Sequence, residues 1–291
     1  MDHWDEVRTA YQVARLGTVS GAADVLGVHH ATVIRHIDAL EQRLGVKLFQ
    51  RHARGYTPTE AGNDLLKVAQ ATDDQFSQLG ARLRGQGDGV SGDLTVTSLA
   101  SFSTMLTPVL VKFQQANPDL RVRYLTGDRL FRLEYGEAHV AIRAGAAPDQ
   151  PDNVVQKFIN QRTAMVASQS YIDRKGMPTS DEDLVNHDFV SHDDDASRAP
   201  FHRWLMNKVP LERIVYRTMD NRSLRDAIAA GAGIGFLPTY EISMMPGIVK
   251  VMDARDEWSA DLWLVTHVDL HRTPKVKQFL SFLKEQAGTW D

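Results

Sequence analysis

Residues 11–28 read YQVARLGTVSGAADVLGV and decide the fold of the N-terminal part. Apolar side chains at helical spacing run from Val7 to Ala14, which indicates one helix. A second, short helix is expected over 21–26, with Thr18 or Ser20 as its N-cap. Residues 27–29 (GVH) then break the helical pattern. The stretch therefore predicts two helices followed by a turn.

A third helix follows the turn. Val33, Ile37, Leu40 and Leu44 lie on one helical face, and Gly45 stands where a C-cap is expected. Two helices joined by a three-residue turn predict a helix-turn-helix, with Val28 as a buried anchor in the turn. The N-terminal end of the second helix of such a motif enters the major groove of DNA. Side chains on its other faces are expected at His30, Ala31, Ile34, Arg35 and Asp38.

Composition narrows the class of protein. The chain has 291 residues, of which 43% are hydrophobic, 24% are charged and none is cysteine. These fractions are typical of a globular protein, and two or three folding units are expected from the length. The lack of cysteine excludes disulfides, thiolate zinc sites and cysteine nucleophiles. We find neither a signal peptide nor an apolar stretch of about 18 residues, so a cytoplasmic location without a membrane span is expected.

The charge distribution favours a nucleic-acid partner for the N-terminal part alone. The chain has a net charge of −4, but residues 28–58 carry five basic and two acidic side chains, a local net charge of +3. The acidic total comes from residues 88–291, with 23 basic and 27 acidic side chains. A local basic patch is the electrostatic signature of a DNA-binding surface.

Residues 46–57 predict two short strands, 46–49 and 54–57, around a turn at 51–55. A long helix over 59–84 follows, with Thr59 as its N-cap. Its apolar side chains keep helical spacing, which favours a dimer contact; packing within the same chain is the alternative. The stripe contains Leu65, Leu66, Ala69, Thr72, Phe76, Leu79 and Leu83. Residues 85–92 include four glycines and predict a linker.

From residue 93 onward, strands alternate with helices, which predicts an α/β domain with a parallel sheet. Strands are expected at 93–99, 120–125, 139–143, 163–167, 214–219, 235–237 and 262–266, and helices at 105–116, 130–135, 224–230 and 274–286. Ligands of such sheets bind outside the carboxyl ends of the strands. Hydroxyls, helix N-termini and an arginine at these ends suit a small organic anion. The expected contacts are Ser98, Ser101, Phe102, Thr126, Gly127, Arg143, His202 and Asn221; pairing of Arg143 with Asp128 is the alternative for that arginine.

Three segments resemble the LysR-type transcriptional regulators: residues 11–28, residues 39–51 (ALEQRLGVKLFQR) and residues 58–62 (PTEAG). Residues 231–238 (GAGIGFLP) are similar to a motif of the family's regulatory domain. The resemblance implies an all-α winged helix-turn-helix domain, a long linker helix and a two-lobed α/β effector domain like that of periplasmic binding proteins. The implied division is 1–58, 59–91 and 92–291, with lobe I at 92–162 and 267–291, and lobe II at 163–266. The chain would cross between the lobes near 161–164 and 265–268.

The resemblance also implies site residues. Arg35 matches the arginine of the recognition helix, Thr32 and His36 match positions that face DNA, and Arg51 and Arg54 match the wing. The sequence departs from the family at four positions: His29-His30 replace Ser-Gln, Ile34 replaces Ser, and Asp38 stands where a basic residue is frequent. Ile34 could meet a thymine methyl or pack on the wing, and His30 could meet a purine N7 or a phosphate. The implied partners are double-stranded DNA, a small-molecule effector, a second copy of the chain and RNA polymerase. The resemblance implies a dimer or tetramer, and it implies no cofactor and no metal.

Three other classes of protein fit the sequence less well. An enzyme is disfavoured because no nucleophile elbow, zinc-binding helix motif or P-loop is present. The glycines at 231–235 precede a strand, so they do not form a dinucleotide-binding turn. A solute-binding protein would match the C-terminal part alone, and a DNA-binding protein without a ligand would match the first 60 residues. The sequence as a whole favours a DNA-binding regulator with an effector domain.

Overall fold

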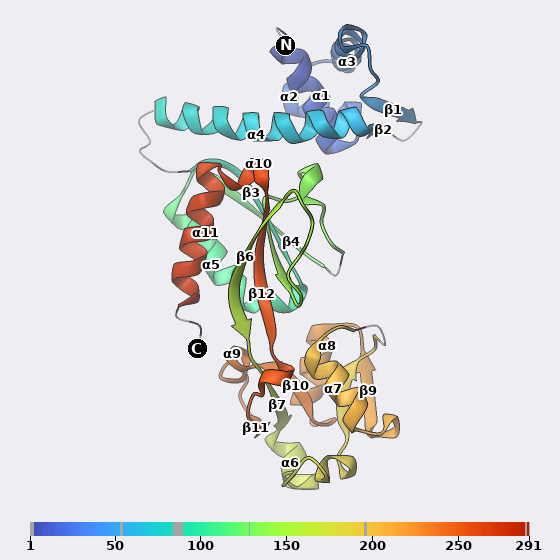
Figure 1. Cartoon of the computed structure of the whole chain (residues 1–291), viewed down its shortest axis with the longest axis vertical. Helices are drawn as coiled ribbons and strands as arrows, with labels where there is room; N and C mark the ends of the chain where they lie inside the picture. Colours follow the sequence, from blue (N-terminus) through green and yellow to red (C-terminus); the bar gives the residue numbers. More distant parts are fainter. Residues whose placement is uncertain are drawn as a thin grey trace.

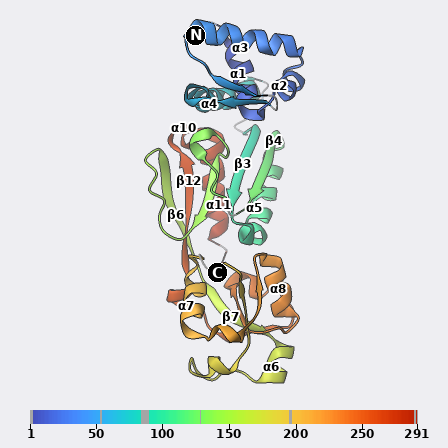
Figure 2. The same cartoon turned by 90° about the vertical axis from the view of Figure 1, so that its right-hand side faces the viewer.

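The computed structural model describes residues 3–52, 55–83, 90–127, 129–194, 197–288 and 290. These residues form three tiers along the long axis of the molecule (Figures 1 and 2). The N-terminal helices lie at one end, a sheet flanked by helices lies in the middle, and a smaller α/β lobe lies at the other end. The arrangement follows the order of the chain except that the last strand and helices return to the middle tier.

The first tier is a helix-turn-helix with a two-stranded wing. Its helices are α1 (Trp4–Leu16), α2 (Val19–Leu26) and α3 (His30–Leu44), and its hairpin pairs β1 (Phe49–His52) antiparallel with β2 (Gly55–Pro58). Thr18 is the N-cap of α2, because its Oγ1 accepts a hydrogen bond from the backbone N–H of Gly21. Gly45 ends α3 with a left-handed φ of 70°, as expected.

Two local expectations for this tier are wrong. Val28 is 38% exposed and is not a buried anchor; the core is made by side chains of the helices, with Ala22, Val33 and Ile37 fully buried. The first wing strand begins at Phe49 rather than at residue 46. The backbone N–H of Leu48 donates to the Glu41 carboxylate, so it is not available to a strand partner.

Helix α4 (Glu60–Leu83) lies between the first and second tiers (Figure 1). Thr59 caps it, with Oγ1 accepting from the N–H of Gly62. Leu66 and Ala69 are buried against the helix-turn-helix core, whereas Phe76 is 53% and Leu79 is 41% exposed. The apolar stripe therefore divides: its first part packs within the chain, and part of its second half faces outward. The expected linker lies mostly outside the described residues.

The middle tier, lobe I, has a five-stranded sheet of order β4-β3-β5-β12-β6. The strands are β3 (Gly92–Ser98), β4 (Leu120–Thr126), β5 (Val140–Ala144), β6 (Asn153–Gln161) and β12 (Ala260–His267). Helices α5 (Ser103–Ala116) and α11 (Pro274–Ala287) supply much of its core, and α10 (Val268–His271) connects β12 to α11. The expected helix at 130–135 is only a single 3-10 turn, Leu133–Tyr135.

The other outer tier, lobe II, pairs β7 (Thr163–Ser168) with β10 (Gly235–Pro238) and β11 (Ile248–Met252), and β8 (Phe189–His192) with β9 (Ile214–Thr218). Its helices are α6 (Gln169–Lys175), α7 (Pro200–Lys208), α8 (Asn221–Ala229) and α9 (Thr239–Ile242). Trp204, Phe236 and Trp258 meet edge to face in its core. Short 3-10 turns lie at Asp183–Asn186, Leu211–Arg213 and Asp256–Trp258 in this lobe, and at Ala100–Phe102 in lobe I.

Two features of the sheets differ from expectation. Strands β3, β4 and β5 are parallel, but β12 runs antiparallel to β5 and β6, so the sheet is mixed. The chain leaves lobe I at Arg162, within the expected range. It returns before Ala260 rather than near 265–268, because β12 pairs with lobe I strands along its whole length. The residues of β12 therefore belong to lobe I.

Candidate DNA-binding surface and effector cavity

The N-terminal half of α3 presents an exposed face at the outer end of the molecule (Figure 2). Val33, Ile37 and Leu40 point into the core and fix the rotation of the helix. This rotation leaves His29, His30, Ala31, Ile34 and Arg35 exposed and Thr32 half-buried. Ile34 is exposed, which fits a role at the surface rather than burial on the wing. Arg35 forms no hydrogen bond or ion pair with another described residue.

His36 contacts a neighbouring helix. Its Nδ1 lies 2.9 Å from Oγ1 of Thr9, a buried residue of α1. The side chain is half-buried where α3 meets α1. A DNA contact of His36 stays a prediction.

Arg51 of the wing is held by two carboxylates of α3. Its Nη2 lies 2.5 Å from Oδ1 of Asp38 and 3.2 Å from Oε2 of Glu41, and its guanidinium lies over the Tyr56 ring. Asp38, one of the departures from the family pattern, thus ties the recognition helix to the wing. A phosphate contact of Arg51 stays a prediction, and Arg54 lies outside the described residues.

Glu41 is a functional residue that the sequence reasoning missed. It is 3% exposed, and its Oε1 accepts from the N–H groups of Leu48 (2.9 Å) and Phe49 (3.2 Å), while Lys47 donates to Oε2 (2.7 Å). Burial alone would raise its pKa, but these hydrogen bonds outweigh burial and the pKa of Glu41 lies below its usual value. Its position next to Leu40, four residues after Ile37, was the available signal that it lies on the buried face.

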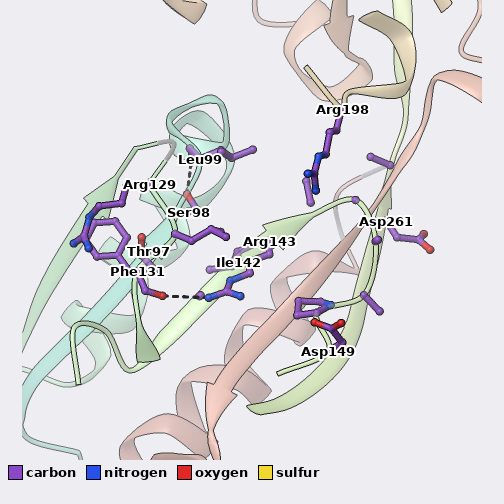
Figure 3. A pocket seen from close by; sticks show the side chains of 18 of the residues that line it. Thr97, Ser98, Leu99, Arg129, Phe131, Ile142, Arg143, Asp149, Arg198 and Asp261 are labelled. Atoms are coloured by element: carbon purple, nitrogen blue, oxygen red, sulfur yellow. Dashed lines mark hydrogen bonds between the residues drawn. The ribbon is translucent and has the colours of Figure 1, made fainter. Parts of the chain in front are cut away.

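A cavity of about 890 Å³ lies between lobe I and lobe II (Figure 3). Its volume is within the range of small-molecule sites, roughly 300–1,000 Å³. Lobe I contributes residues at the carboxyl ends of β3 and β5, and lobe II contributes residues at the start of α7. The lining includes Thr97, Ser98, Leu99, Gly127, Arg129, Phe131, Arg143, Asp149, Gln150, Arg198, Pro200, Arg203 and Asp261.

Three of the eight expected effector contacts line this cavity: Ser98, Gly127 and Arg143. The Ser98 Oγ is 2.7 Å from the Tyr124 hydroxyl, and burial raises the pKa of that tyrosine. Ser101 lies in the 3-10 turn after β3 and Thr126 ends β4, and neither is part of the lining. Phe102 is a correction, because its side chain is buried in the core formed by α5 and the sheet.

His202 and Asn221 belong to lobe II and do not line the large cavity. His202 is buried on α7, with Nδ1 3.2 Å from the Ser191 Oγ. Asn221 Oδ1 lies 2.8 Å from Nε2 of His192. Both side chains contact partners in their own lobe, and an effector contact at either position stays a prediction. Arg198 and Arg203, which do line the cavity, were missed because nothing in the local sequence marks them as facing lobe I.

The Arg143 guanidinium is oriented by two neutral acceptors. Its Nη2 donates to the Phe131 carbonyl oxygen (3.2 Å), and its Nη1 donates to Oε1 of Gln150 (3.4 Å). Burial lowers the pKa of Arg143, and Glu134 acts in the opposite direction. No described carboxylate forms an ion pair with it. The expected alternative partner, Asp128, lies outside the described residues.

Among the residues that the structure describes, no three histidine, aspartate or glutamate side chains gather as metal ligands. In the same part of the chain, none of the helices is both long and apolar enough to cross a bilayer.

Known proteins share both parts of this architecture. The family model described as a bacterial regulatory helix-turn-helix protein of the lysR family matches residues 4–63, and the LysR substrate binding domain matches residues 87–288. The transcriptional regulator IlvY of Escherichia coli is 26% identical over 87% of this chain and 88% of its own length. The regulator CrgA of Neisseria meningitidis is 24% identical over 98% of this chain and 97% of its own. These relatives are regulators and not enzymes.

Solved structures show the same fold. The crystal structure of ArgP from Mycobacterium tuberculosis superposes with a TM-score of 0.72 at 20% identity, covering 99% of this chain and 98% of that one. The structure of CrgA, a LysR-type regulator, gives a TM-score of 0.60 at 21% identity over 99% of this chain and all of its own. Because the substrate-binding model alone matches more than half of the residues, the chain belongs to the LysR family of transcriptional regulators.

Proposed function

We propose that this regulator binds an interrupted palindrome in double-stranded DNA as a dimer, through the exposed face of α3, and that a small anion in the cavity between its lobes changes the complex. One observation carries the DNA-binding part. The first turns of α3 are exposed, and Arg35 has no partner among the described residues. In a helix-turn-helix dimer, two such helices read half-sites one helical turn or a multiple of it apart.

The finer parts of the proposal concern residues, assembly and location. The proposed DNA contacts are His29, His30, Ala31, Thr32, Ile34, Arg35, His36, Arg51 and Arg54. The proposed domains are 1–58, 59–91 and 92–291, with residues 163–259 as lobe II. Tetramer assembly and contact with RNA polymerase rest on family membership alone. Because the partner is DNA, we place the regulator in the cytoplasm.

DNase I footprinting on the DNA beside the protein's own gene tests the proposal. The expected result is a long, interrupted protected region with the wild type, altered when an effector is added. Retention of DNA that is nonspecific and salt-sensitive, without a footprint there or at sites mapped across the genome, would contradict specific binding.

Replacing Arg35 by alanine is expected to weaken specific binding by about 1–3 kcal/mol and to relax discrimination at one base pair, if the guanidinium makes a bidentate base contact. Affinities for the operator and for random DNA are measured at constant salt. Arg8→Ala, which removes an exposed arginine of α1, is the control and should change little. An equal loss on both DNAs would show that Arg35 meets only phosphate.

The dimer part of the proposal rests on the outward half of the apolar stripe. Val68, Phe76 and Leu79 are exposed on α4, and Phe76 packs edge to face on Trp4. A two-fold contact along this helix would cover these side chains and bring two copies of α3 to one side of the assembly.

Leu79→Glu is expected to dissociate the dimer, because it places an ionised carboxylate within an apolar contact. Light scattering measures the mass. Val185→Glu is a matched control, since Val185 of lobe II has the same exposed fraction, 41%, as Leu79. A mass that stays unchanged for Leu79→Glu would show that the dimer contact lies elsewhere.

A further inference from the structure

Arginines from both lobes line the cavity without an ion-pair partner among the residues that the structure describes. Arg143 comes from β5 of lobe I, Arg203 comes from the first turn of α7 in lobe II, and Arg198 lies just before that helix. None of the three forms an ion pair with a described residue. In Figure 3, Arg198 extends from lobe II toward lobe I, and the Arg143 guanidinium lies next to Phe131. The described lining therefore carries arginine side chains without ion pairs from both lobes.

The other charged groups of the lining do not neutralise these arginines. Arg129 is paired with Glu137, with Nη1 3.0 and 3.1 Å from its two carboxylate oxygens. Asp261 is paired with Lys157 at 2.8 Å, and its side chain points away from the cavity in Figure 3. Asp149 is the remaining described carboxylate. Three arginines against one aspartate leave a net charge of +2 in the described lining.

Two hydrogen bonds fix the orientation of the Arg143 guanidinium and leave other N–H groups for an anion. Two of its five N–H groups donate to the neutral acceptors Phe131 O and Gln150 Oε1, which fix its orientation. Its other N–H groups can donate to a carboxylate or phosphate in fork geometry. Burial of Arg143 strengthens such a contact, because fewer water molecules compete with the anion.

We propose that the cavity binds a small organic dianion whose two acidic groups are separated, one meeting Arg143 of lobe I and the other meeting Arg198 and Arg203 of lobe II. This inference rests on the proposed effector function of the same cavity. The arginines of the two lobes repel each other as the lobes approach. A dianion between them replaces that repulsion by two attractive contacts, so its binding favours the closed arrangement. A monoanion would leave one wall uncompensated.

The first test measures binding to the full-length protein by calorimetry, without DNA and at constant ionic strength. The probes are succinate, glutarate and adipate, with 3-phosphoglycerate to distinguish phosphate from a second carboxylate and butyrate as the monoanion. At least one dianion should bind about tenfold more tightly than butyrate, since it adds hydrogen bonds to a charged group. Binding of 3-phosphoglycerate alone would keep the proposal and assign the second charge to phosphate. No dianion binding, or equal binding of butyrate, would overturn it.

The second test asks whether both lobes contribute. Arg143→Gln and Arg203→Gln should each weaken dianion binding by about tenfold or more. Arg203→Gln, the lobe II change, should weaken butyrate binding less than it weakens dianion binding. Arg222→Gln is the control, because Arg222 is exposed on α8 and does not line the cavity. Arg198→Gln replaces Arg203→Gln if the latter does not fold, as judged by circular dichroism. Dianion binding that survives every lobe II change would overturn the bridging geometry.

A footprint on operator DNA separates this inference from the proposed function. A dianion that binds through both lobes but leaves the footprint unchanged would uphold the inference and contradict the effector role. A normal footprint together with no dianion binding would overturn the inference while leaving DNA binding intact.

Discussion

Replacing Glu41 by alanine is expected to destabilise the helix-turn-helix domain by about 3 kcal/mol. The change removes the acceptor for the backbone N–H groups of Leu48 and Phe49 and an ion-pair partner of Lys47 and Arg51. Both N–H groups are buried, and a buried donor without a partner costs the free energy of its desolvation. Hydrogen–deuterium exchange of peptides within residues 30–58 measures the loss in the full-length protein.

Two variants separate the contributions of Glu41. Glu41→Gln keeps an oxygen that can accept from the backbone and loses the charge, so it should cost less than alanine. Glu60→Ala removes an exposed acid at the start of α4 and should leave the exchange of residues 30–58 unchanged. Equal exchange in Glu41→Ala and wild type would contradict the role assigned to this carboxylate.

Glu41 also predicts how the stability of this domain depends on pH. Its folded-state pKa lies below the ordinary value of 4.5, so the unfolded chain binds the proton more readily. The stabilisation is present in full above about pH 4.5 and is lost as the pH falls through the folded-state pKa. The difference in stability between wild type and Glu41→Gln should therefore narrow on acidification.

The helices and their ends follow from the sequence because local signals determine them. The Thr18, Gly45 and Thr59 caps satisfy backbone groups within a few residues of themselves. The direction of β12 could not be predicted this way. A strand near the C-terminus that inserts between β5 and β6 is chosen by the packing of lobe I, and no local pattern distinguishes it from a parallel strand.

The residues of the effector cavity likewise include some that local sequence signals predict and some that they do not. Ser98, Gly127 and Arg143 could be predicted because they follow or end strands whose carboxyl ends meet at one edge of the sheet. Arg198 and Arg203 were missed, since they line the cavity only because lobe II lies next to lobe I in the folded chain. The contact of His36 with Thr9 was missed because it depends on where α1 crosses α3. In each case, the missing information is the placement of one element against another.

The second large effect is expected at Gly62, where helix propensity and packing oppose each other. Replacing a glycine inside a helix by alanine ordinarily stabilises it by about 1 kcal/mol. At Gly62, however, a Cβ atom would lie 2.0 Å from the carbonyl oxygen of Leu48. That oxygen cannot easily move, because it accepts a hydrogen bond from Thr59 N–H at 2.9 Å.

We therefore expect Gly62→Ala to destabilise the domain by about 2 kcal/mol, which is typical of overpacking. Urea unfolding of the full-length protein measures the change in the free energy of unfolding. Ala71→Gly in the same helix measures the effect of helix propensity alone, and we expect it to lower the free energy of unfolding by about 1 kcal/mol. A gain in stability for Gly62→Ala would show that α4 can shift away from the wing. Because Leu48 donates to Glu41 and accepts from Thr59, such a shift would also move α3 relative to α4. If α4 shifts in this way, operator affinity should fall although stability does not, and although Gly62 is remote from the exposed face of α3.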